Sequence, residues 1–115
     1  MKKILFVNLD QNFIGNFQTK FAHHYDVLAT ESHKAAYQLC QTLDIDLLIT
    51  PLPTKNSERQ GKELKKLLKK LNSPKFAHLT KVLSTTEKGD YQFEDYMKYG
   101  ITAILMNINE IEKWL

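Results

Sequence analysis

The stretch Asp46-Leu47-Leu48-Ile49-Thr50-Pro51-Leu52-Pro53 decides how this chain is expected to fold. An apolar run without polar alternation, stopped by two prolines, is typical of a strand covered on both faces, as in a parallel sheet between helices. In such sheets, ligands bind beyond the carboxyl ends of the strands. Pro51 occupies that place here, and its side chain offers neither a nucleophile nor a charge.

Apolar runs and helical patterns alternate on both sides of this stretch. The runs predict strands over residues 3–7, 27–29, 46–50, 81–84 and 101–106. Helical spacing of apolar residues predicts helices over residues 11–24, 33–43, 58–71 and 91–99, and a short one over 110–115. The predicted N-caps are Ser32, Asp90 and Asn109, and Gly100 is the predicted C-terminal glycine. This alternation predicts an α/β fold with a parallel sheet and right-handed crossovers.

Length and composition predict one domain over residues 1–115. Hydrophobic residues make up 43% of the chain and charged residues 25%, as in a soluble globular protein. The one cysteine, Cys40, lies in a helical pattern and is predicted to be an inert core thiol in a reducing compartment. The apolar run at the start, Ile4 to Val7, is too short for a signal peptide or a membrane span. We therefore expect a cytoplasmic protein that does not enter the membrane.

The net charge of +3 comes from one predicted helix. Residues 57–71 hold six Lys and Arg against two Glu, an excess of +4, so the rest of the chain is close to neutral. Two interpretations stay open: a solvated face over a leucine stripe, or a docking patch for an acidic partner or nucleic acid. Arginine and aromatic residues are nearly absent from this helix, which argues against nucleic acid for this domain alone.

Other catalytic and metal-binding patterns are absent from the sequence. His23 and His24 are adjacent on a helix and diverge by about 100°, so they do not form an i, i+4 metal pair. No glycine follows the first strand until Gly15, which argues against a phosphate-binding loop. No Ser-His-Asp or Cys-His set stands out. We therefore expect no metal, no cofactor and no enzymatic activity.

Four segments carry a resemblance to a known family. They are Lys2 to Asp10, Asp46 to Thr50, Val82 to Asp90, and Tyr99-Gly100 leading into the fifth strand. In order and spacing they resemble the receiver domain of bacterial two-component response regulators, the CheY-like family. The resemblance implies a flavodoxin-like, doubly wound five-stranded parallel sheet of order 2-1-3-4-5 with helices on both faces.

Receivers accept a phosphoryl group on an Asp at the end of the third strand. An acidic pair holds Mg²⁺, a Thr or Ser and a Lys bind the phosphoryl oxygens, and an aromatic residue on the fifth strand follows the switch. The acidic pair falls on Asn8 and Leu9, with Asp10 the only acid left in that turn. The other positions are Pro51 for the acceptor, Thr86 or Thr85 for the hydroxyl, Asn107 for the lysine and Ile104 for the aromatic. The register of the loop leaves Leu52 and Pro53 as other acceptor positions. None of these is an Asp, so the resemblance implies a degenerate pocket without Mg²⁺ or phosphoryl transfer.

Two functions remain open. The first is a phosphorylation-independent pseudo-receiver that acts by protein–protein contact, with another protein or as a homodimer, alone or as the N-terminal part of a longer regulator. Its contact residues would come from the aromatic cluster near the end of the chain, Tyr91, Phe93, Tyr96, Tyr99 and Trp114, unless these residues belong to the core. The alternative is a small-ligand sensor that uses the neutral groups of the vacated pocket, Asn8, Asp10, Thr50, Thr86 and Asn107.

Overall fold

The computed structural model describes residues 1–53, 58–85 and 96–115. The strands are β1 (Lys2–Val7), β2 (Tyr25–Thr30), β3 (Leu47–Pro51), β4 (Thr80–Ser84) and β5 (Ala103–Leu105). The α-helices are α1 (Gln11–Phe21), α2 (His33–Thr42) and α3 (Glu58–Leu71), and the 3₁₀ helices are η1 (Pro74–Phe76) and η2 (Ile108–Trp114). Up to β4, strands and helices thus alternate along the described residues, as the apolar patterns predicted.

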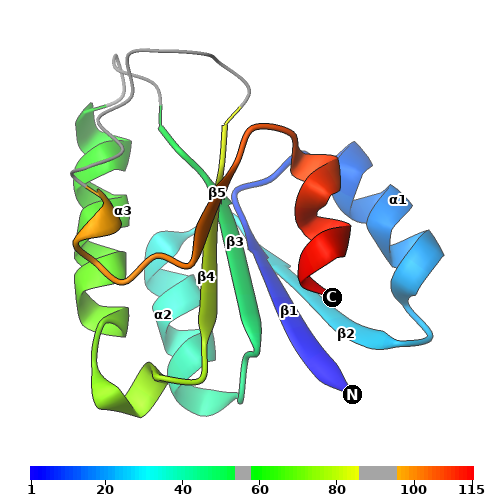
Figure 1. Cartoon of the computed structure of the whole chain (residues 1–115), viewed down its shortest axis with the longest axis horizontal. Coiled ribbons are helices and arrows are strands. Elements are labelled where there is room, and N and C mark those ends of the chain that lie inside the picture. The colour runs from blue at the N-terminus through cyan, green and yellow to red at the C-terminus, as the bar shows by residue number, and fades with distance from the viewer. Residues whose placement is uncertain (54–57, 86–95) are drawn as a thin grey trace.

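The five strands form one parallel sheet in the order β2-β1-β3-β4-β5. This order confirms the doubly wound topology that the resemblance implied. Helices α2 and α3 cover one face of the sheet, while α1 and η2 cover the other (Figure 1). The central position of β3 explains its sequence, because Leu47 to Thr50 are buried and helices lie on both sides.

Aromatic side chains fill the core between the sheet and α1. The ring of Phe6 on β1 meets the rings of Phe13 and Phe17 edge-on, with centroid distances of 5.7 and 5.0 Å. Spacing of three or four residues puts these α1 rings on one side of the helix, which is the apolar stripe that the sequence predicted. An ion pair of 2.6 Å between Lys20 and Glu112 joins α1 to η2.

Aliphatic side chains fill the core on the other face. Leu5, Val7 and Leu48 of the sheet pack with residues of α2 and α3 in one buried cluster. Cys40 of α2 lies in this cluster, and burial raises the pKa of its thiol to about 11. The thiol therefore stays protonated at neutral pH, and its burial confirms the prediction that Cys40 belongs to the core.

Several predicted boundaries are wrong. Helix α1 ends at Phe21 rather than at residue 24, and β5 spans three residues rather than 101–106. The N-cap of the last helix is Asn107, not Asn109, because the Asn107 side chain accepts the Asn109 N–H at 3.0 Å. Residues 90–95, on which most of the predicted fourth helix falls, lie outside the described residues. Gly100 has a φ of 75°, and its N–H donates to the carbonyl of Met97 at 3.3 Å. Both features are expected of a glycine that ends a helical turn.

Lys81 is a buried cation that the sequence analysis did not single out. It lies on β4 with 6% of its surface exposed, and its Nζ donates to the carbonyl of Leu71, at the end of α3, over 3.4 Å. No carboxylate of the described residues pairs with it in an ion pair. Burial therefore lowers the pKa of the Lys81 ammonium below 10.5.

This burial predicts a pH dependence of stability. Between the lowered pKa and 10.5 the unfolded chain binds more protons than the folded chain, so Lys81 makes the free energy of unfolding rise with pH across this window. In urea denaturation followed by circular dichroism, we expect the wild type to gain stability relative to Lys81→Met between neutral pH and a pH close to 10.5. Equal pH slopes for the two proteins would contradict the expectation.

Candidate functional site

The carboxyl ends of the parallel strands meet at one edge of the sheet. Asn8 follows β1, Pro51 ends β3, Thr85 follows β4, and Asn107 lies just beyond β5. The structure therefore brings these predicted positions to the same edge of the sheet. Thr86, the other predicted hydroxyl position, lies outside the described residues.

The turn after β1 uses its polar groups locally. Asn8 has a φ of 58°, which Asn tolerates better than most residues, and its N–H donates to the carbonyl of Thr30 at 2.7 Å. Leu9 packs against the core between the sheet and α1. Asp10 is the N-cap of α1, and its carboxylate accepts the N–H of Asn12 at 3.3 Å. This turn therefore offers a cation one exposed carboxylate, that of Asp10, which already caps α1.

Pro51 fits the end of β3 without losing a hydrogen bond of the sheet. Leu52 donates its N–H to Ser84 of β4 at 2.7 Å, so the alternation along the strand turns the backbone nitrogen of Pro51 toward β1. Pairing between β1 and β3 ends at Phe6 and Ile49, before that point. The missing N–H of proline therefore costs little here. The next side chain, Leu52, is buried in an apolar cluster between β4 and α3.

Thr50 carries an unsatisfied hydroxyl next to Pro51. Its side chain is fully buried, and Oγ1 has no hydrogen-bond partner among the described residues. A buried hydroxyl without a partner costs about 1–3 kcal/mol, as judged from protein mutations. The Thr50 hydroxyl is therefore an exception to the rule that buried polar groups form hydrogen bonds.

The positions after β4 and β5 are also committed to the fold. Thr85 is buried, and its N–H donates to Leu105 at 2.8 Å. The side chain of Asn107 caps η2. Ile104, at the predicted switch position, is half-buried and packs against the cluster that contains Leu52 and Leu83.

The described part of the chain holds neither a cluster of metal ligands nor a membrane-spanning helix. Residues 1–53, 58–85 and 96–115 contain no group of three His, Cys, Asp or Glu side chains that could hold a metal ion. Mg²⁺ prefers several oxygen ligands, which Asp10 by itself does not provide. Within the same ranges, no helix has the length and apolar character needed to cross a membrane.

Solved structures with this arrangement include bacterial response regulators. A response regulator from Thermotoga maritima superimposes with a TM-score of 0.73 at 12% identity, covering 99% of this chain and 94% of that chain. The chemotaxis protein CheY4 of Vibrio cholerae gives a TM-score of 0.72 at 17% identity, over 99% of this chain and 95% of that chain. The chain has the receiver fold. No protein-family model and no curated protein matches the sequence.

A third structure with the receiver fold gives a chemical reference. A response regulator protein from Burkholderia pseudomallei, solved with a phosphorylated aspartic acid and a calcium ion, has a TM-score of 0.72 at 16% identity. The match covers 97% of this chain and 65% of that chain. At sequence identities of 12–17% the likeness establishes the fold, and the chemistry of the site depends on the residues that this chain carries there.

The predicted contact aromatics separate by exposure. Tyr96 is 8% exposed and packs in the core against α3, so its burial argues against a direct contact with a partner. Tyr99 is half-buried, and Tyr91 lies outside the described residues. Trp114 exposes 41% of its surface. Two exposed methionines that the sequence analysis did not predict as contacts, Met97 at 51% and Met106 at 45%, also lie in this last part of the receiver fold.

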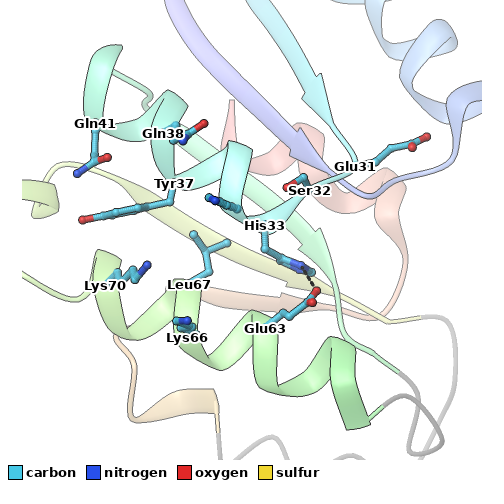
Figure 2. A pocket seen from close by; sticks show the side chains of 11 residues that line it. Glu31, Ser32, His33, Tyr37, Gln38, Gln41, Glu63, Lys66, Leu67 and Lys70 are labelled. Carbon is cyan, nitrogen blue, oxygen red and sulfur yellow. Dashed lines mark ion pairs between the residues drawn. The ribbon is translucent and has the colours of Figure 1, made fainter.

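The sequence analysis also missed a hollow between α2 and α3. Its lining joins residues about 30 positions apart, such as His33 and Glu63, whose side chains form an ion pair of 3.6 Å (Figure 2). The lysine-rich composition of α3 was the one signal of this site in the sequence.

Proposed function

We propose that this chain is a pseudo-receiver, a module of bacterial two-component-type signalling that works without phosphorylation and acts through protein contact. The observation that carries the proposal is Pro51 at the carboxyl end of β3, the position at which the family resemblance expects the phosphoacceptor. Proline has no group that a phosphoryl donor could modify. The proposal treats residues 1–115 as one cytoplasmic domain without catalytic activity.

The neighbouring side chains support the same proposal. Leu9 belongs to the core, and the side chains of Asp10 and Asn107 serve as helix caps. A carboxylate that attacks an anionic phosphate needs a metal ion and a cation to offset the charge that builds up. The described residues at this edge of the sheet provide neither a second carboxylate for a metal nor a lysine at position 107.

The proposed contact surface is centred on Trp114 of η2, which exposes 41% of its surface. Met97 and Met106 are further exposed large apolar residues available for contact. Tryptophan and methionine are enriched where protein interfaces bury their central contacts. A partner protein or a second copy of the chain would cover the Trp114 surface.

Acetyl phosphate provides the test. After incubation with acetyl phosphate and Mg²⁺, we expect intact-mass analysis to show no phosphoryl adduct, because Pro51 lacks an acceptor group. Trp114 is the one tryptophan of the chain, so its emission reports on the contact surface and should stay unchanged. The Burkholderia pseudomallei response regulator with the phosphorylated aspartic acid is the positive control. A stable adduct on this chain would refute the proposal.

A second candidate function rests on Thr50. A fully buried hydroxyl without a partner beside the edge of the sheet favours a small-ligand sensor, in which a polar, uncharged ligand would accept or donate the missing hydrogen bond. Asn8, Asp10, Asn107 and Thr86 would complete its polar surroundings.

A further inference from the structure

Helices α2 and α3 border a surface hollow of about 730 Å³. It lies on the face of the sheet opposite η2, the 3₁₀ helix that carries Trp114 (Figure 1). Leu67 lies at its base, and the side chains around it are polar or charged (Figure 2). The volume falls within the range of pockets that hold ligands or side-chain clusters, about 300–1,000 Å³.

One end of the hollow carries uncompensated positive charge. Lys66 and Lys70 are one turn apart on α3, so their charges repel each other across the same side of the helix. The ammonium of Lys70 lies 4.9 Å from the centroid of the Tyr37 ring, and that ring also packs near Phe76, at 6.1 Å. A half-buried aromatic ring held in place on two sides offers a rigid contact next to the two cations.

The other end of the hollow carries the carboxylates of Glu31 and Glu63 (Figure 2). The carboxylate of Glu63 lies 3.5 Å from Nε of Arg59, which offsets its charge, and 3.6 Å from Nδ1 of His33. The lining as a whole holds one more cation than carboxylates: Lys34, Lys66 and Lys70 against Glu31 and Glu63. The hollow thus has a cationic end with an aromatic ring and an end that carries carboxylates.

We propose that this hollow binds an acidic segment of a partner protein. Carboxylates of that segment would meet Lys66 and Lys70, and an apolar side chain between them would pack on the half-buried ring of Tyr37. An extended phosphate chain fits less well, because the described residues that line the hollow include lysines but no arginine, the residue best suited to bind phosphates in a bidentate way. This contact is separate from the Trp114 surface and does not depend on whether the chain is phosphorylated.

The test uses a fluorescein-labelled peptide of alternating Glu and Leu residues, measured by fluorescence anisotropy at low salt. The variant Lys66→Glu/Lys70→Glu reverses both charges at the hollow. The matched control Lys62→Glu/Lys69→Glu reverses two exposed charges of the same helix that do not line the hollow, with an identical change in net charge. Circular dichroism confirms that both variants are folded.

We expect the variant at the hollow to weaken binding about tenfold or more and the control to weaken it by less than about threefold, since only the former faces the bound carboxylates. Binding of the wild type should weaken as salt rises. Equal losses in the two variants would overturn the proposal, because the helix would then attract acidic chains without using the hollow. The proposal would also be overturned if the wild type did not bind the peptide, or if a peptide with Gln in place of Glu bound equally well. A DNA duplex that binds more tightly than the peptide, and that loses affinity in Lys66→Glu/Lys70→Glu, would overturn it as well.

Discussion

Replacing Phe6 by alanine is expected to lower the free energy of unfolding by about 3–5 kcal/mol. Phe6 is completely buried in the middle of β1, and its ring joins the sheet to two rings of α1, Phe13 and Phe17. The substitution removes the apolar surface of the ring and leaves a cavity that close-packed neighbours fill only in part. Because domains of this size are stable by about 5–15 kcal/mol, the variant would be marginal at room temperature.

Urea denaturation followed by circular dichroism measures this effect. Phe21→Ala is the matched control, since it deletes the same ring from the same aromatic cluster at a half-buried position. We expect it to lose clearly less stability than Phe6→Ala. If Phe6→Ala does not fold, Phe6→Leu, which leaves a smaller cavity, should give an intermediate loss. Equal losses at the two positions would show that the Phe6 ring contributes no more to the stability of the core than the half-buried Phe21 ring.

Replacing Thr50 by valine is expected to raise the free energy of unfolding by about 1–3 kcal/mol. Valine has nearly the same shape, and it removes a buried hydroxyl that has no hydrogen-bond partner among the described residues. The matched control is Thr30→Val, where the hydroxyl accepts the N–H of Ser32 at 3.3 Å. The control should lose stability or stay unchanged, because the substitution leaves that N–H without its acceptor.

The same substitution distinguishes the two candidate functions. If the chain senses a polar, uncharged ligand through Thr50, a thermal-shift screen of such metabolites should stabilise the wild type and leave Thr50→Val unaffected. If the chain is a pseudo-receiver, no metabolite should separate the two proteins. A loss of stability in Thr50→Val without any ligand would mean that the hydroxyl is satisfied, and it would remove the support for the sensor.

The sheet could be predicted because its central strands β1, β3 and β4 are buried on both faces. Residues 4–7, 47–49 and 82–83 are continuous apolar runs, which polar surface segments rarely imitate. Lys81 precedes the third run, and its ammonium reaches the carbonyl of Leu71 at the end of α3. That contact depends on where α3 ends and cannot be read from the strand itself.

The ends of elements and the surface sites were harder to predict. Asn107 and Asn109 are the same residue type two positions apart, and the cap falls to Asn107 because of the point at which β5 leaves the sheet. The hollow between α2 and α3 depends on the packing of His33 against Glu63, which local patterns do not contain. The predicted pocket positions gather at one edge of the sheet, and their function stays a prediction.

The use of Asp10 and Asn107 as helix caps has an evolutionary consequence. Each cap of this kind stabilises a helix by about 1 kcal/mol, so a mutation that redirects either side chain lowers stability at once. An aspartate introduced at position 51 would meet Asp10 as the one carboxylate of the turn after β1, because Leu9 packs against the core. Building phosphoryl chemistry at this end of the sheet would thus require several substitutions together, the first of which bring no benefit.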